Sequence, residues 1–126
     1  MLIVFMSVTG NVYKFVSFLD MDSLEIDFND SLKEVNRDYI VIVPTYDDSI
    51  TNTFSDFIEY KDNLKHLKGI VGSGSRNFGT EYVFNAKDLS KKYNKPLIFD
   101  FEFSGDNDVL AFKKEVERIE ITRVKE

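Results

Sequence analysis

The sequence contains no cysteine and only one histidine, His66. Without thiols the chain cannot form disulfide bonds, use a thiolate nucleophile or hold an iron–sulfur cluster through cysteine. We interpret His66, which is expected between a helix and a strand, as a structural or exposed residue. Nucleophilic catalysis by a Ser–His or Cys–His pair therefore has little support.

Basic charge and long apolar segments are also scarce. The formal net charge is −6, which argues against a nucleic-acid partner because contacts with phosphates need a basic surface. The longest apolar runs are far too short to span a bilayer. The first residues, MLIVFM, lack the basic start and the length of a signal peptide. We therefore expect a cytoplasmic protein that binds neither nucleic acid nor a membrane.

Apolar runs and apolar residues at helical spacing alternate along the chain. A length of 126 residues favours one domain, spanning residues 1–126, with a sizeable core. Strands are predicted from the apolar runs, over residues 2–7, 24–28, 39–44, 67–74 and 96–103. Helices are predicted from spacings of three or four, near residues 12–19, 54–58, 82–93 and 109–119.

This alternation predicts an α/β fold with a parallel sheet and helices on both faces. For five strands we expect a flavodoxin-like, doubly wound sheet of order 2-1-3-4-5, whose ligand lies at the carboxyl ends of the strands where the winding reverses. Three loops should meet there, over residues 7–11, 45–53 and 72–79. They are also the segments richest in Gly, Ser, Thr and Asn, which indicates a binding site.

The first of these loops, SVTGNV, offers hydrogen-bond donors without charge. Ser7, Thr9 and Asn11 supply polar side chains, Gly10 allows close approach of the backbone, and no basic residue occurs before Lys14. Because the start of a helix attracts anions, the loop suits a phosphate group. An ordinary turn with Asn11 as helix cap is the alternative interpretation.

The other two loops fit a planar ring better than a nucleotide triphosphate. GSGSRNFG matches neither a dinucleotide fingerprint nor a Walker loop, because Asn77 replaces the third glycine and Thr80 replaces the lysine. Phe78 can stack on a heterocycle or, alternatively, lie in the core. Tyr46 can cover a ring from the other side. Asp47 and Asp48 are more simply solvated acids than metal ligands.

Several segments resemble a known family. SVTGNV resembles the flavodoxin phosphate loop. GIVGSGSRNFG, KPLIFDFEFSG and DVLAFKKEVERI are similar to segments of NrdI proteins, the flavodoxin-like family that serves class Ib ribonucleotide reductase. The likeness extends over nearly the whole chain, in order and at the length of the family.

The resemblance implies bound FMN. Its phosphate would be held by Ser7, Thr9, Gly10, Asn11 and the amide of Val12. One side of the isoalloxazine ring would be lined by Thr45 and Tyr46, with Asp47 beside them, and the other by Ser73, Gly74, Asn77, Phe78 and Gly79. Val12 stands where flavodoxins usually have a hydroxyl, and Ser75 where the family commonly has asparagine.

The resemblance also implies a role as an activator rather than as a stand-alone metabolic enzyme. Flavin reduced by a donor would react with dioxygen. The resulting superoxide- or peroxide-type oxidant would reach the dimanganese site of the class Ib small subunit and help to generate its tyrosyl radical. The alternatives are a generic flavodoxin that carries single electrons, a receiver-like domain with Asp47 as phosphoryl acceptor, and a flavin-free interaction module.

Residues 45–53 depart from the family pattern because they include no glycine. Related proteins commonly have glycine there, where a peptide can reorient toward flavin N5 on reduction. Asp47 and Asp48 also add negative charge near a reduced, anionic flavin. We therefore expect this protein to stabilise its reduced flavin states differently from relatives that carry the glycine.

Overall fold

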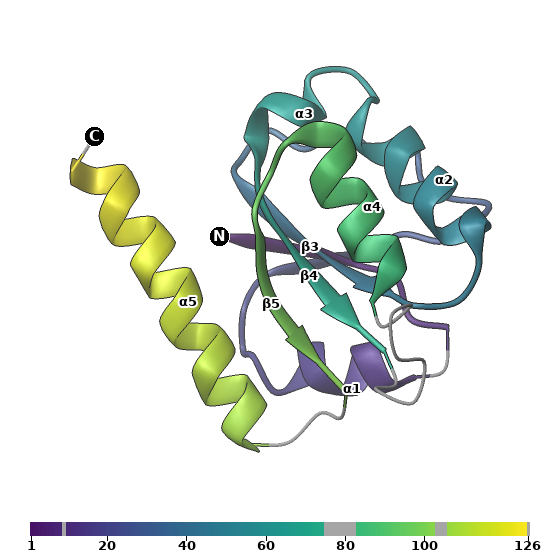
Figure 1. The fold of residues 1–126 in the computed structure, drawn as a ribbon. Helices are drawn as coiled ribbons and strands as arrows, with labels where there is room; N and C mark the ends of the chain where they lie inside the picture. Colours follow the sequence, from purple (N-terminus) through teal and green to yellow (C-terminus); the bar gives the residue numbers. More distant parts are fainter. Residues whose placement is uncertain (9, 75–82, 103–105, 126) are drawn as a thin grey trace.

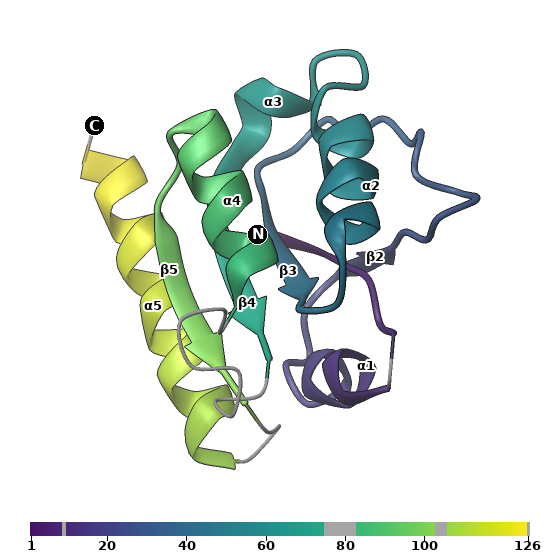
Figure 2. The ribbon, with the colours of Figure 1, turned by 45° about the vertical axis from the view of Figure 1, so that its right-hand side comes forward.

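The computed structural model describes residues 1–8, 10–74, 83–102 and 106–125 (Figure 1). These residues form five helices: α1 (Asn11–Ser17), α2 (Asp48–Ile58), α3 (Asn63–His66), α4 (Phe84–Tyr93) and α5 (Asp106–Lys125). The helices α2 and α4 lie side by side, and α5 runs along the edge of the sheet (Figures 1 and 2). None of the helices in the described ranges combines the length and apolarity needed to cross a bilayer.

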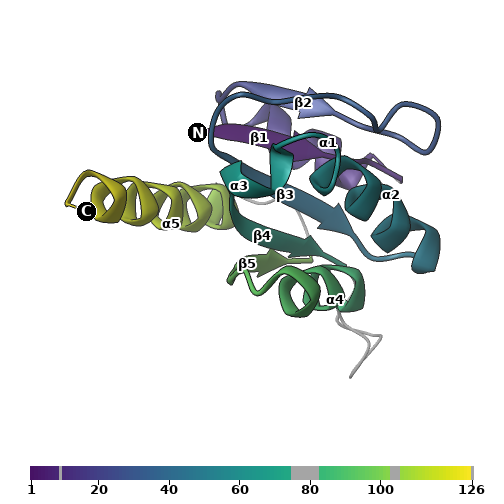
Figure 3. The same ribbon diagram turned by 90° about the horizontal axis from the view of Figure 1, so that it is seen from above.

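The strands form one parallel sheet of order β2-β1-β3-β4-β5, as Figure 3 shows. Their bounds are β1 (Leu2–Phe5), β2 (Ser23–Glu25), β3 (Tyr39–Pro44), β4 (Leu67–Ser73) and β5 (Leu97–Phe101). This order confirms the predicted flavodoxin-like α/β fold. It places the reversal of winding between β1 and β3, where a ligand is expected.

Two apolar cores, one on each face of the sheet, explain the unbroken apolar runs. Alternate side chains of a strand point to opposite faces. Val4 and Val41 belong to the core under α2 and α4, whereas Ile3 and Ile40 belong to the core under α1 and α5. Because β1 and β3 are covered on both sides, their side chains are apolar apart from the hydroxyl of Tyr39.

The helix α2 begins within the segment that the sequence predicts as a loop, so the prediction of a loop over residues 45–53 is wrong from Asp48 onward. The carboxylate of Asp47 caps the helix by accepting a hydrogen bond from the backbone N–H of Ser49, at 2.9 Å. Ile50 and Phe54, one turn apart, are fully buried. A cap and an apolar stripe therefore outweigh the polar composition of the segment.

Smaller differences concern the ends of strands and one short helix. The strand β1 ends at Phe5, whereas the sequence predicts a strand over residues 2–7. The strand β2 ends at Glu25, whereas the sequence predicts a strand over residues 24–28. The chain turns back after it, since Asp27 and Asp30 exchange backbone hydrogen bonds. The short helix α3 was not predicted, because four residues are too few to show a helical period.

Candidate functional site

Three chain segments leave the sheet at the same edge. In the ladders Phe5 of β1 pairs with Ile42 of β3, and Pro44 at the end of β3 pairs with Ser73 at the end of β4. Because β1, β3 and β4 are neighbours and parallel, the residues that follow them lie next to one another. The strand order thus brings together the points at which the three loops singled out by the sequence leave the sheet.

The loop after β1 is organised by the side chain of Ser7. Its hydroxyl oxygen accepts hydrogen bonds from the backbone N–H groups of Gly10, at 3.1 Å, and of Tyr13, at 3.2 Å. Gly10 precedes α1 with φ of +88°, a left-handed conformation that glycine adopts without strain. The backbone amides at the start of α1 are therefore gathered around a small neutral hydroxyl.

The side chain of Val12 takes no part in this polar loop. It is 3% exposed and packs in the core with Phe15. Of the groups of Val12, only the backbone amide is therefore available to a ligand at the start of α1. Thr9 and the side chain of Asn11 lie outside the described residues.

The segment after β3, residues 45–47, is joined to the end of β4. The hydroxyl of Thr45 donates a hydrogen bond to the carbonyl oxygen of Ser73, at 2.7 Å. A Cβ atom at Gly74 would lie 2.7 Å from Thr45 Oγ1, so only glycine permits this approach. The amide of Gly74 in turn donates to the carbonyl of Phe101, at 3.1 Å. Hydrogen bonds thus connect the segment after β3 to the end of β4, and the end of β4 to the end of β5.

The same segment is held from the other side by Asn85, a residue that the sequence analysis missed. Asn85 lies in the first turn of α4 and is fully buried. Its Oδ1 accepts a hydrogen bond from the backbone N–H of Tyr46, at 3.0 Å, and its Nδ2 donates to the carbonyl of Asp47, at 2.8 Å. One signal was available, because Asn85 precedes the buried Leu89 by one helical turn and is thus a polar residue on the apolar face.

Tyr46 and Asp47 present different groups at this edge. The ring of Tyr46 is 63% exposed, as a side chain available to cover a ligand would be. The carboxylate of Asp47 faces the start of α2, where it contacts both the amide and the hydroxyl of Ser49. Its charge is therefore partly offset by the positive end of the helix dipole.

Comparison with known proteins adds to this geometry. The family model "NrdI Flavodoxin like" matches residues 3–114. The chain belongs to the NrdI flavodoxin-like family. Protein NrdI of Bartonella tribocorum is 34% identical over 124 residues, covering 94% of each chain. Protein NrdI of Wigglesworthia glossinidia brevipalpis is 32% identical, covering 93% of this chain and 88% of its own.

The fold is shared with a solved flavodoxin. A short-chain flavodoxin associated with a non-canonical PDU bacterial microcompartment matches with a TM-score of 0.58 and 22% identity, covering 96% of each chain.

Proteins of the NrdI flavodoxin-like family are generally flavin-binding. The donors after β1 suit a phosphate and the segment after β3 suits a ring edge, so the described residues fit a phosphorylated flavin.

Several residues of the expected NrdI site follow Gly74 in the chain. Asn77, Phe78 and Gly79 lie outside the described residues, as do Ser75 and Arg76. Ser73 and Gly74, which precede them, are described at the end of β4 and are joined to Thr45. The roles of Asn77, Phe78 and Gly79 remain predictions from the resemblance.

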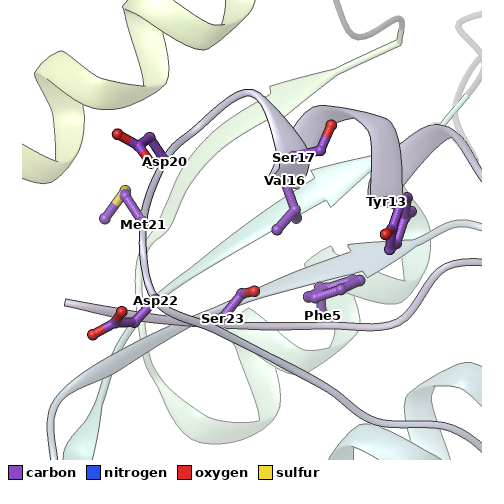
Figure 4. Close-up of a pocket in the computed structure, with 8 residues that line it drawn as sticks. All are labelled: Phe5, Tyr13, Val16, Ser17, Asp20, Met21, Asp22 and Ser23. Carbon is purple, nitrogen blue, oxygen red and sulfur yellow. The ribbon is translucent and has the colours of Figure 1, made fainter.

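Two other features are not part of the three segments after β1, β3 and β4. A hollow of about 360 Å³ beside α1 is lined by Phe5 and Tyr13 together with Asp20 and Asp22 (Figure 4). Its carboxylates disfavour an anionic ligand. His66 ends α3, directly before the start of β4, with its Nδ1 3.4 Å from Asp38 Oδ1. It is therefore at the end of β4 opposite to the candidate site.

Proposed function

We propose that this NrdI-family protein binds FMN at the carboxyl ends of β1, β3 and β4 and acts, once reduced, as an activator of class Ib ribonucleotide reductase. The observation that carries the proposal is the family match over residues 3–114, which includes the segments after all three strands. Localisation in the cytoplasm, where a reductase and a flavin-reducing donor meet, is part of the same proposal.

The segment after β1 would hold the phosphate group. Ser7 already orients the amides of Gly10 and Tyr13, and the amides of Asn11 and Val12 lie between them. A doubly charged phosphate would thus be bound by backbone N–H groups and a hydroxyl rather than by basic side chains. This suits a protein of net charge −6, because no cationic patch is needed.

The segments after β3 and β4 would hold the ring. Tyr46 offers an exposed aromatic side chain, and Thr45 and Gly74 bring the two segments into contact. Bound flavin supplies the redox chemistry, since two electrons and two protons from the reduced ring convert dioxygen to hydrogen peroxide, and one electron gives superoxide. The chain's own contribution is to position the ring edge, to admit oxygen and to dock on the small subunit.

The proposal is tested in two steps. The protein is first titrated with FMN, with ring absorbance and fluorescence as readouts. It is then reduced anaerobically and mixed with a manganese-loaded class Ib small subunit and oxygen, and the tyrosyl radical is measured by electron paramagnetic resonance. We expect radical only when FMN-loaded, reduced protein and oxygen are all present.

Free reduced FMN at the same concentration is the control for this experiment. Equal radical yield with free FMN would show that the protein is a carrier at most, and failure to bind FMN would remove the whole proposal.

A further inference from the structure

Asn85 connects two helices and the candidate site through one buried side chain. Besides its contacts with Tyr46 and Asp47, its Nδ2 donates to Thr51 Oγ1 in α2, at 2.9 Å. The side chain is 0% exposed. Three hydrogen bonds therefore join the first turn of α4 to the segment after β3 and to the helix that follows it.

The position of these bonds along the backbone is what matters. The N–H of Tyr46 precedes the Tyr46–Asp47 peptide bond, and the C=O of Asp47 follows it. A single amide group holds both, so it fixes the chain on either side of that peptide bond. Neither residue is glycine, so a change to left-handed backbone angles is disfavoured there as well.

We propose that Asn85 is a positioning residue that fixes the conformation of residues 45–47 at the edge of the flavin site. The proposal deepens the proposed function, on which its flavin part rests, while its conformational part concerns the protein alone. A rearrangement that moves the N–H of Tyr46 or the C=O of Asp47 away from Asn85 would leave buried polar atoms of its amide without these partners, which costs the desolvation of those atoms. These two hydrogen bonds, the Asn85 tether, therefore oppose any change with flavin charge that moves the N–H of Tyr46 or the C=O of Asp47.

Only a side chain with both an acceptor and a donor at this length satisfies the arrangement. Aspartate in place of Asn85 keeps the acceptor for the N–H of Tyr46 but cannot donate to the carbonyl of Asp47. Leucine has similar volume and provides neither. The two variants Asn85→Asp and Asn85→Leu therefore separate the two halves of the tether.

Asn63 provides a matched control for these variants. It is also 0% exposed. Its Oδ1 accepts from the amide of Val35, at 2.9 Å, and its Nδ2 donates to the carbonyls of Lys33 and Phe57, each at 2.8 Å. It begins α3, at the opposite end of β4 from the candidate site. Asn63→Leu thus removes an equivalent set of bonds without touching residues 45–47.

The first readout uses protein without flavin. Amide hydrogen exchange at Tyr46, followed by NMR, should be about 10-fold faster in Asn85→Leu than in Asn63→Leu, as expected for one lost hydrogen bond. Asn85→Asp should retain most of the Tyr46 protection. Equal exchange at Tyr46 in Asn85→Leu and Asn63→Leu would overturn the proposal. If Asn85→Leu does not fold, the same comparison is made between Asn85→Ser and Asn63→Ser. Equal exchange at Tyr46 in these two variants would likewise overturn the proposal.

The second readout uses protein loaded with FMN. Spectroelectrochemical titration gives the equilibrium constants for the two one-electron steps of flavin reduction. The ratio of these constants should change about 10-fold or more in Asn85→Leu, because about one hydrogen bond is lost. It should not change in Asn63→Leu. Unchanged potentials in all variants would overturn the flavin part of the proposal. Failure of wild-type protein to bind FMN would instead remove the proposed function, and hydrogen exchange would still decide the role of Asn85.

Discussion

The side chain of Tyr39 combines a ring that stabilises the core with a hydroxyl group that destabilises it. Tyr39 begins β3 and is fully buried, with its ring edge-on to Phe57 at a centroid distance of 5.5 Å. Among the described residues its hydroxyl oxygen is buried without a hydrogen-bond partner. Burial, and secondarily the nearby Tyr93, raise the pKa of this phenol above its ordinary value. The ring therefore stabilises the core, whereas the hydroxyl detracts from it.

Replacement of Tyr39 by phenylalanine tests this division. Tyr39→Phe keeps the ring contact and removes a buried polar group without a partner, so the free energy of unfolding should stay the same or rise by up to about 1 kcal/mol. Tyr39→Ala, which leaves a cavity, should lose about 3–5 kcal/mol. Urea denaturation monitored by circular dichroism measures both. A loss above about 1 kcal/mol in Tyr39→Phe would mean that the hydroxyl has a partner after all.

At the scale of elements, strands were easier to predict than helix starts. The runs over β1 and β3 are apolar throughout, a pattern that reflects burial on both faces and is visible in the sequence alone. The start of α2 was not predicted from the sequence, because Thr, Asp, Ser and Asn are common both in loops and at helix caps. The Asp47-Asp48-Ser49 run was a capping signal that the composition masked. Asn85 was missed for another reason, since its partners lie 34 to 39 residues away along the chain.

The cap at Asp47 leads to a prediction about α2. Asp47→Ala removes the acceptor for the Ser49 amide and should lower the free energy of unfolding by about 1 kcal/mol, whereas Asp47→Asn can still cap the helix and should change it by less than about half as much. In FMN-loaded protein Asp47→Asn should also raise the flavin potential, because it removes a negative charge that opposes formation of an anionic reduced ring.

Asp56→Asn is the control, since it removes an exposed charge from the same helix, two turns further from the segment. A flavin potential that responds equally to Asp47→Asn and Asp56→Asn, or to neither, would contradict a local effect of Asp47.

At the scale of the whole molecule, the order of the strands decides where a site can form. The alternation of apolar runs and helical spacings predicts a parallel sheet, and the order β2-β1-β3-β4-β5, the first choice among doubly wound sheets of five strands, is confirmed. That order alone puts the ends of β1, β3 and β4 together. The contacts that then shape the edge, such as Thr45 with Ser73, depend on side-chain packing between elements and do not appear in any local pattern.

A ligand that contacts the ends of three strands at once should stabilise the entire fold. FMN at 100 times its dissociation constant should raise the free energy of unfolding by about 2.7 kcal/mol, since it binds only folded protein. Riboflavin at the same concentration lacks the phosphate and should give a clearly smaller rise. Ser7→Ala loses the hydroxyl that orients the Gly10 and Tyr13 amides. It should therefore reduce the effect of FMN and leave that of riboflavin unchanged.

Urea denaturation at a series of flavin concentrations measures these differences. Equal stabilisation by FMN and riboflavin in wild-type protein would show that the segment after β1 does not bind the phosphate, even if the ring binds. Equal loss of both effects in Ser7→Ala would instead show that this segment acts on the ring site as a whole. The pair of ligands thus distinguishes a phosphate-binding loop from a turn that merely shapes the edge of the sheet.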